Sequence, residues 1–285
     1  MTSEPKTSVP LAPHDRLVRA LAELPSCLVA FSGGVDSAVV AKAAQLALGA
    51  RAIAVTGVSA SLAAGELETA QRIARAIGIR HETVATEELA DAEYLENRPN
   101  RCWHCKDELY QQLEALAKRW ECESIVNGAN ADDLSDFRPG MRAADEHRVR
   151  SPLAECGFDK RAVRQIAQHW ELEVWNKPAT PCLSSRVVYG LEITPEMLNR
   201  IDRAEQMLRE LGLSNVRVRY HHDDLARLEV AIDDLPLLST GDVRCQVVER
   251  LRELGFRYVT IDLEGFRSGS FQQLISAEEL LKESQ

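Results

Sequence analysis

The sequence predicts an α/β protein in which a parallel sheet carries helices on both faces and a smaller α+β domain follows. Short apolar runs alternate with segments of helical periodicity as far as residue 127, a pattern that indicates parallel βαβ units. Beyond a proline-marked stretch at 177–190, the expected order becomes helix, strand, strand, helix, strand. We therefore expect a flexible tail at 1–15, a larger domain at 16–185 and a C-terminal domain at 186–285.

The elements of the larger domain follow from two kinds of pattern. Apolar runs predict buried strands at 28–31, 52–56, 80–84 and 124–127. Apolar residues at spacings of three and four predict helices at 14–24, from 35 onward, at 61–77 and at 103–120. Ser61 is the expected N-cap of the third of these helices, and Gly78 ends it. Parallel strands place the residues that follow them at one edge of the sheet, where ligands bind.

The same patterns predict the helices and strands of the C-terminal domain. Helices are expected at 195–211 and 242–254, and strands at 216–220, 228–232 and 258–263. The boundary between the two domains is expected between Pro178 and Thr194.

Composition excludes several classes of protein. With 34 basic and 44 acidic residues among 285, the net charge is −10, which argues against nucleic acid as the main partner. No apolar run reaches the length of a membrane helix, and the polar opening segment resembles no signal peptide. We expect a cytoplasmic protein that does not bind membranes. Its seven cysteines are then reduced thiols, available for metal binding or catalysis.

A glycine turn follows the first predicted strand. The residues are Ser32-Gly33-Gly34-Val35-Asp36-Ser37, and a helix begins at Val35. A strand, a glycine turn and a helix start together direct backbone N–H groups and the positive helix end at an anion. An ordinary turn is the alternative, but the ordered set favours a phosphate. A Walker lysine is missing, so the loop has no lysine placed to assist transfer of a γ-phosphate.

A second polar loop, Asn127-Gly128-Ala129-Asn130-Ala131-Asp132-Asp133, follows the fourth strand. Its position predicts that Asn127 and Gly128 lie near the nucleotide, as does Gly57 at the end of the second strand. Asp36 and Asp132 are the candidate Mg²⁺ ligands. The alternative is a polar loop that only caps the next element.

Two cysteine motifs suggest a second centre. Cys102 and Cys105 have the spacing of a metal chelate or a redox pair, and Cys182 is the candidate third ligand. Cys182 lies in Pro181-Cys182-Leu183-Ser184-Ser185-Arg186, where we expect the charge of Arg186 to favour the thiolate. An inert loop thiol is the alternative. Cys27, in a buried strand, is expected to be a core residue.

A third candidate site is a pair of arginines on one strand. Arg217 and Arg219 share a face because side chains alternate along a strand, and two guanidinium groups suit a phosphate or carboxylate. The alternative is a solvated basic face, and Glu229 on the adjacent strand is expected to pair with one of the arginines. A further glycine-rich stretch, 265–270, is a candidate anion nest without an assigned role.

The loop at 32–37 resembles the PP-loop of the ATP pyrophosphatase superfamily, which has a Rossmann-like sheet. The motifs as a set resemble the LarE family of sulfur transferases in nickel-pincer cofactor synthesis, which serves lactate racemase maturation. The motifs that carry this resemblance are Ser32 to Ser37, Arg101-Cys102-Trp103-His104-Cys105-Lys106, Asn127 to Asp133, Cys182 to Arg186, Arg217-Val218-Arg219 and Ala226-Arg227-Leu228-Glu229. They span nearly the whole chain, and the Cys182 and Arg217 motifs are the most specific to LarE.

The resemblance implies a reaction. The substrate is pyridinium-3,5-biscarboxylic acid mononucleotide, whose carboxylate attacks the α-phosphate of ATP to give an adenylate and pyrophosphate. Cys182 then either donates its own sulfur and becomes dehydroalanine, or holds a 4Fe–4S cluster with Cys102 and Cys105 that delivers sulfide. The resemblance also implies which residues bind the mononucleotide, namely Trp103, Arg186, Glu205, Arg217 and Arg219. It implies that the C-terminal domain serves substrate binding and oligomerisation in a homohexamer. Other proteins of nickel-pincer synthesis are the partners that it implies.

Three other functions compete with this interpretation. A tRNA-thiolating PP-loop enzyme would combine the same nucleotide site with paired cysteines, but the net charge argues against RNA binding. An amide ligase similar to NAD synthetase would leave Cys182 without a role. A non-catalytic nucleotide or iron–sulfur carrier would release no pyrophosphate.

Overall fold

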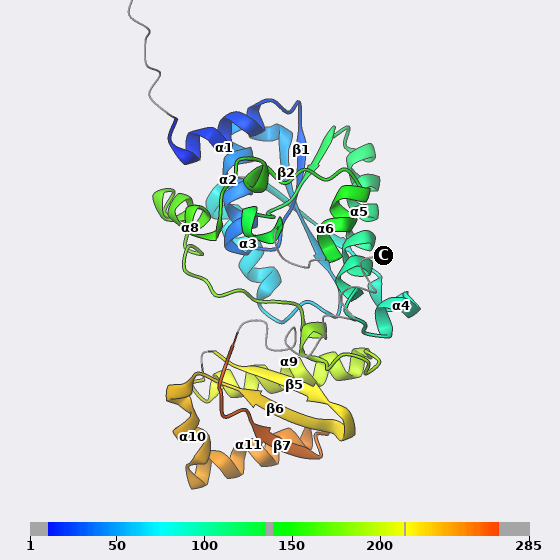
Figure 1. Ribbon diagram of the computed structural model, residues 1–285, viewed down its shortest axis with the longest axis vertical. Coiled ribbons are helices and arrows are strands. Elements are labelled where there is room, and N and C mark those ends of the chain that lie inside the picture. The colour runs from blue at the N-terminus through cyan, green and yellow to red at the C-terminus, as the bar shows by residue number, and fades with distance from the viewer. Residues whose placement is uncertain (1–10, 135–138, 214, 268–285) are drawn as a thin grey trace, which may run out of the picture.

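Two β-sheets organise the chain, and Figure 1 shows each with its own helices. The computed structural model describes residues 11–134, 139–213 and 215–267. The larger sheet contains β1 (Cys27–Ala30), β2 (Ala52–Val58), β3 (Arg80–Ala85) and β4 (Ser124–Val126). All its pairs are parallel, in the order β3-β2-β1-β4. The predicted α/β class is confirmed.

The order of the strands determines where the candidate site lies. After β3 the chain crosses to the far side of β1, so that Cys27 pairs with both Ala52 of β2 and Ser124 of β4. The loops that follow β1 and β4 therefore lie side by side at a topological switch point, where open parallel sheets bind ligands. These are the two loops in which the sequence predicted phosphate and Mg²⁺ ligands.

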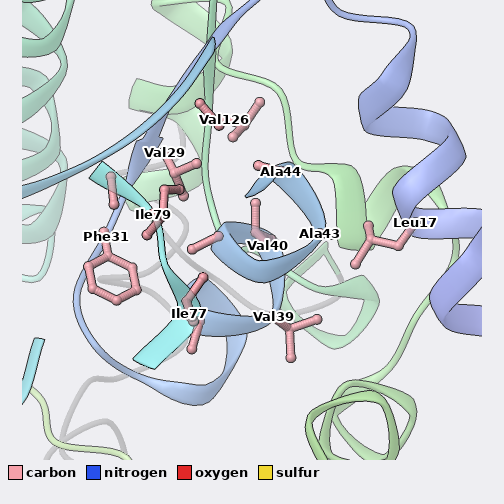
Figure 2. Close-up of a cluster of buried hydrophobic side chains, with 14 of the residues drawn as sticks. Leu17, Val29, Phe31, Val39, Val40, Ala43, Ala44, Ile77, Ile79 and Val126 are labelled. Carbon is pink, nitrogen blue, oxygen red and sulfur yellow. The ribbon is translucent and has the colours of Figure 1, made fainter. Parts of the chain in front are cut away.

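Helices cover both faces of this sheet. They are α1 (Pro13–Ala22), α2 (Val35–Leu48), α3 (Glu66–Ile77), α4 (Ala92–Leu95), α5 (Arg101–Arg119), α6 (Pro139–Glu146), α7 (Pro152–Glu155) and α8 (Lys160–His169). One face packs on α2, α3 and α8, and the other on α5 and α6. Figure 2 shows the first of these cores, where Val29 and Val126 meet the small side chains of α2.

The second sheet contains β5 (Arg217–His221), β6 (Leu225–Glu229) and β7 (Tyr258–Ile261), in that order. The first pair is antiparallel and the second is parallel. Its helices are α9 (Pro195–Glu210), α10 (Leu235–Ser239) and α11 (Gly241–Glu253). Tyr94 of α4 and Ala63 join the core of this sheet, so the two halves of the chain are packed together. The division at 185/186 stays a prediction.

Several boundaries differ from the expected ones, and three of the differences have a visible reason. Helix α3 begins at Glu66, because Ser61 lies in a turn where its hydroxyl donates to Glu88 Oε1 at 2.8 Å. Strand β6 begins three residues earlier than expected, at Leu225, because it pairs along the whole of β5. Helix α1 begins at Pro13, within the expected tail, of which residues 1–10 lie outside the described part of the chain.

Several short helices were not predicted from the sequence. These are α4, α6, α7, α8 and α10. No helix in the described part of the chain has the length and apolar character needed to cross a membrane.

One partly exposed contact between helices depends on pH. His147, which follows α6, bonds Asp107 Oδ1 at 2.8 Å and Glu114 Oε1 at 2.9 Å, both on α5. Burial lowers the pKa of His147, but the hydrogen bonds and charges of the two carboxylates outweigh burial and raise the pKa above its ordinary value. A raised folded-state pKa contributes stability that is complete below the unfolded-state value and is lost as pH rises through the folded-state value.

We therefore expect His147→Gln to lower the melting temperature more at pH 6 than at pH 9. Calorimetry at both values measures this difference, with His222→Gln, at an exposed position, as the control. An equal loss at both values would show that the imidazolium charge contributes nothing to the docking of α6.

Candidate active site

The loop after β1 has the geometry of a phosphate cradle. Gly33 has φ +70°, and a Cβ there would lie 2.9 Å from Ala70 Cα, so only glycine fits. Ser37 Oγ donates to Gly34 O at 3.1 Å and lies 3.2 Å from Ser32 Oγ, which closes the loop. The first N–H groups of α2 have no acceptor within the helix, so the loop presents them at the switch point.

The loop after β4 packs directly on this cradle. A Cβ on Gly128 would lie 2.7 Å from Ser37 N, so a side chain there would separate the two loops. Asn127 Oδ1 accepts from Ala129 N and Ser151 Oγ, both at 2.9 Å, and fixes the turn. Asn130 Nδ2 donates to Asp36 Oδ1 at 3.3 Å. The structure therefore brings together the two loops that were predicted from separate motifs.

A lysine that the sequence analysis missed lies on these loops. Lys160 Nζ forms an ion pair with Asp36 Oδ2, and the backbone N–H of Lys160 donates to Asp132 Oδ2 at 2.9 Å. Both candidate Mg²⁺ ligands thus contact one residue that lies far away in the sequence. The sequence signals that could have located it are Asp159, an acidic N-cap residue, and the amphipathic helix that follows, with Val163, Ile166 and Ala167 on its buried face.

Gly57 has a packing reason to be glycine. Its position at the end of β2 puts it at the same edge of the sheet as the phosphate cradle. A Cβ there would lie 2.9 Å from Leu109 Cδ1 of α5. The preceding Thr56 donates to Phe31 O at 2.7 Å and holds the strand ends together.

The Cys182 loop is fastened to the larger sheet at three points. Leu183 N donates to Ser61 O at 2.8 Å, in the connection that follows β2. Arg101 Nη1 donates to Ser184 O at 2.9 Å, and the hydroxyls of Tyr94 and Ser184 lie 2.6 Å apart. These contacts hold the loop beside the first turns of α5.

The ionisation of Cys105 depends on burial and on the charges around it. Burial raises the pKa of Cys105 to about 12, and the charges of Cys182, Glu88 and Cys102 add to this while Lys106 opposes it. Burial lowers the pKa of Lys106, but Tyr110 and the three thiols raise it overall. Cys102, Cys105 and Cys182 are free thiols, and each has some exposed surface. The structure thus places them in one neighbourhood.

The thiols in this neighbourhood are not arranged to bind a single metal ion. Among the described residues, no group of three or more His, Cys, Asp or Glu side chains is arranged to hold one metal ion. In a 4Fe–4S cluster each thiolate binds a different iron, so the three sulfurs need not converge on one point. Three cysteine thiols are the donor type that such clusters use.

Arg186 differs from its expected role. Its side chain is fully buried, and it donates to the carbonyl oxygens of Pro181 and of Cys182, the latter at 2.8 Å. Its Nε donates to Glu205 Oε1 at 3.0 Å, and Glu205 is also fully buried. Arg186 therefore acts on the backbone of the Cys182 loop, and Glu205 balances its charge.

Arg217 and Arg219 are also buried, with 8% and 7% of their surface exposed, which rules out a solvated basic face. Arg217 donates to Ala179 O at 3.1 Å and Arg219 to Ser185 O at 2.9 Å, so they hold both sides of the Cys182 loop. Arg219 also pairs with Glu229 at 2.8 Å, as expected. Burial and the charge of Arg186 lower the pKa of Arg217 to about 10.

Trp103 lies in a different place from this arginine cluster. Its Nε1 donates to Glu146 Oε2 at 3.0 Å, and Arg142 stacks on its ring at 5.1 Å. Both partners belong to α6, so Trp103 packs between α5 and α6. Cys27 is fully buried, as expected of a core residue. In the stretch 265–270, Phe266 N donates to Val230 O at 2.7 Å, and residues 268–270 lie outside the described part.

We expect Glu205→Ala to lower the free energy of unfolding by about 3–5 kcal/mol, because it leaves the buried charge of Arg186 without a partner. Urea unfolding measures the change. Glu210→Ala removes an exposed pair with Arg250 at 3.9 Å and serves as the control, at about 0–1 kcal/mol. Equal, small changes in both variants would mean that Glu205 does not stabilise the Cys182 loop.

Comparisons with known proteins identify the family of the chain. The asparagine synthase family model matches residues 16–125. The uncharacterised protein slr1717 of Synechocystis is 46% identical over 92% of this chain and 97% of its own length. Pyridinium-3,5-bisthiocarboxylic acid mononucleotide synthase of Lactiplantibacillus plantarum is 37% identical over 93% of this chain and 95% of its own length. With the ATP pyrophosphatase-type fold, these relationships show that the chain belongs to the LarE family and is an ATP-dependent sulfur transferase.

Proposed function

We propose that this enzyme converts a carboxylate of pyridinium-3,5-biscarboxylic acid mononucleotide to a thiocarboxylate in nickel-pincer nucleotide biosynthesis. One observation carries the proposal. The Cys182 loop is hydrogen-bonded, through Leu183 N and Ser61 O at 2.8 Å, to the connection that follows β2, and the end of β2 lies at the sheet edge that carries the phosphate cradle. This contact supports a reaction in which a carboxylate is activated at the cradle before sulfur is transferred at the Cys182 loop.

The first half of the reaction is adenylation. An oxygen of the substrate carboxylate attacks the α-phosphorus of ATP, the bond to the bridging oxygen breaks, and pyrophosphate leaves. The residues that bind ATP are those of the two loops and of the end of β2, namely Ser32, Gly33, Gly34, Asp36, Ser37, Gly57, Asn127 and Gly128. Asp36 and Asp132 would hold Mg²⁺. The carboxylate of Asp36 already pairs with the ammonium group of Lys160, and that of Asp132 accepts from the backbone N–H of the same residue. Mg²⁺ would neutralise charge on the departing pyrophosphate.

The second half needs sulfur at the acyl carbon. Cys102, Cys105 and Cys182 would together hold a 4Fe–4S cluster, because three free thiols gather there beside the cations Lys106 and Arg101. When bound, such a cluster supplies an iron without a protein ligand, at which sulfide can bind. The protein's contribution is to keep the three thiols together by fastening the Cys182 loop at Ser61 and Arg101.

The competing route uses Cys182 itself. Its thiolate would attack the acyl carbon and expel AMP, and a base would then remove the Cα proton while the Cβ–S bond breaks. The sulfur would leave on the substrate and Cys182 would become dehydroalanine. The two routes therefore predict different chemical states of Cys182 after turnover.

Substrate anchoring is assigned to the buried arginine cluster. Arg186, Arg217 and Arg219 lie around Glu205 and Glu229, and the charge of Arg186 lowers the pKa of Arg217. A cluster with this excess of positive charge suits the phosphate or carboxylate of the mononucleotide. Trp103 remains a proposed substrate contact, although its partners here are on α6.

We expect protein reconstituted without oxygen to contain about four irons and four acid-labile sulfides per chain, as one 4Fe–4S cluster requires. Cys105→Ser should lose both, while Cys122→Ser, which changes a thiol elsewhere, should keep them. Iron and sulfide assays make this measurement. After one turnover with ATP and the mononucleotide, the mass of Cys182 should be unchanged. Loss of one H₂S from Cys182 would instead establish the sacrificial route.

A further inference from the structure

Asn97 occupies a left-handed backbone position with a side chain that is fully buried. It follows helix α4 with φ +54°, a conformation that glycine adopts most readily at the end of a helix. Its Nδ2 donates to Val188 O at 2.8 Å and to Leu191 O at 3.0 Å, and its backbone oxygen accepts from Gly190 N at 3.1 Å. Glycine would suit the backbone alone, so the side-chain contacts are the reason for an asparagine at this position.

The side-chain oxygen of Asn97 has a different partner. Oδ1 accepts a hydrogen bond from Arg101 Nη1, and the same nitrogen donates to Ser184 O at 2.9 Å, two residues beyond Cys182. Arg101 lies in the first turn of α5 and is buried. Asn97 therefore fixes where this guanidinium group lies relative to the Cys182 loop.

The charge of Arg101 has no carboxylate to balance it among the described residues. Its hydrogen-bond partners are the two neutral oxygens, and its Cζ lies 5.8 Å from the centre of the Tyr189 ring. Burial lowers the pKa of Arg101, but the charges of Cys102, Cys182 and two tyrosines outweigh burial and raise it overall. A buried charge normally has a partner of opposite charge, so sulfur at these two cysteines is the counter-ion that the site offers.

An asparagine suits this contact better than an aspartate. Its amide oxygen is neutral, so it orients the guanidinium group without cancelling the charge. A carboxylate would form an ion pair with Arg101 and leave less positive charge for sulfur. Arg186, by contrast, is paired with the buried carboxylate of Glu205 at 3.0 Å. Of these two arginines beside the Cys182 loop, only Arg186 has a carboxylate partner in the described part of the chain.

We propose that Asn97 is a positioning residue of the sulfur centre. It aims the guanidinium group of Arg101 at the Cys182 loop and keeps the full charge available to anionic sulfur at Cys182 and Cys102. The proposal deepens the proposed function and rests on it for the role of Cys182. It holds for either source of the transferred sulfur, because a thiolate and a bound sulfide are both anions.

Two reagents of similar size and different charge measure the positive charge beside Cys182. Iodoacetate is an anion and iodoacetamide is neutral, and both alkylate the same thiolate, so the ratio of their rates does not depend on how much thiolate is present. Peptide mass spectrometry of the full-length protein, kept free of iron, gives both rates at Cys182. We expect Asn97→Asp to lower the ratio of the iodoacetate rate to the iodoacetamide rate about threefold or more, the effect of cancelling one unit charge in a partly solvated site.

Two further variants complete the test. Asn97→Gly fits the left-handed backbone and should lower the ratio as well, because no side chain then holds Arg101 in place. Asn199→Asp adds the same negative charge at an exposed position of α9 and should leave the ratio unchanged. An unchanged ratio in Asn97→Asp would overturn the proposal. Rates that rise equally for both reagents would also overturn it, since a loop that is only loosened exposes Cys182 to both alike.

The outcome is independent of folding failures and of the sulfur chemistry. If Asn97→Asp does not fold, an unchanged ratio in Asn97→Gly would overturn the proposal. The rates are measured without ATP or mononucleotide, so such a result would refute the positioning role alone. Failure of the proposed function would appear separately, as release of pyrophosphate that does not depend on the mononucleotide.

Discussion

The buried ion pair between Arg186 and Glu205 is the interaction on which the arrangement of the sulfur centre depends. Both side chains are fully buried, and Arg186 also bonds the carbonyl oxygen of Cys182. Glu205 meanwhile accepts from Arg209 at 2.8 Å and from Val218 N at 3.2 Å. One carboxylate thus connects the Cys182 loop, helix α9 and strand β5. A buried pair of this kind gains little net stability, but removing one partner is costly, so the pair fixes a single position for the loop.

The nucleotide side of the molecule is fixed by close packing instead. The parallel strand order puts the loops after β1 and β4 next to each other, and Gly33 and Gly128 let backbone approach backbone. A side chain at Gly33 would collide with Ala70 of α3, and one at Gly128 would push the two loops apart. Serine hydroxyls and Asn130 then complete the site with hydrogen bonds. The two centres are therefore held in place differently. Charge balance fixes the sulfur centre, and close backbone packing at glycines fixes the nucleotide site.

Much of this arrangement was predictable because it follows from local pattern. The strand at 28–31, the glycine turn and the polar loop after β4 each have a period or a composition that identifies them, and parallel topology brings their ends together. Lys160 was not predictable in this way, because its contact with Asp36 depends on how α8 packs against the sheet, which the pattern of one helix does not reveal. The contacts of Arg186 were hidden for a related reason. Its position beside Cys182 suggested that its charge favours the thiolate, and only the structure places its buried side chain on Glu205 and on the carbonyl oxygen of Cys182.

The shared core has a practical consequence. Tyr94 and Ala63 belong to the larger half by sequence, yet they pack with Leu183, Leu198 and Val218 around the smaller sheet. A truncated chain that stops before α9 would expose this apolar surface to water, and such surfaces promote aggregation. Limited proteolysis or recombinant expression of the first half alone would then yield an insoluble fragment, so biochemical dissection has to proceed through point substitutions in the intact polypeptide.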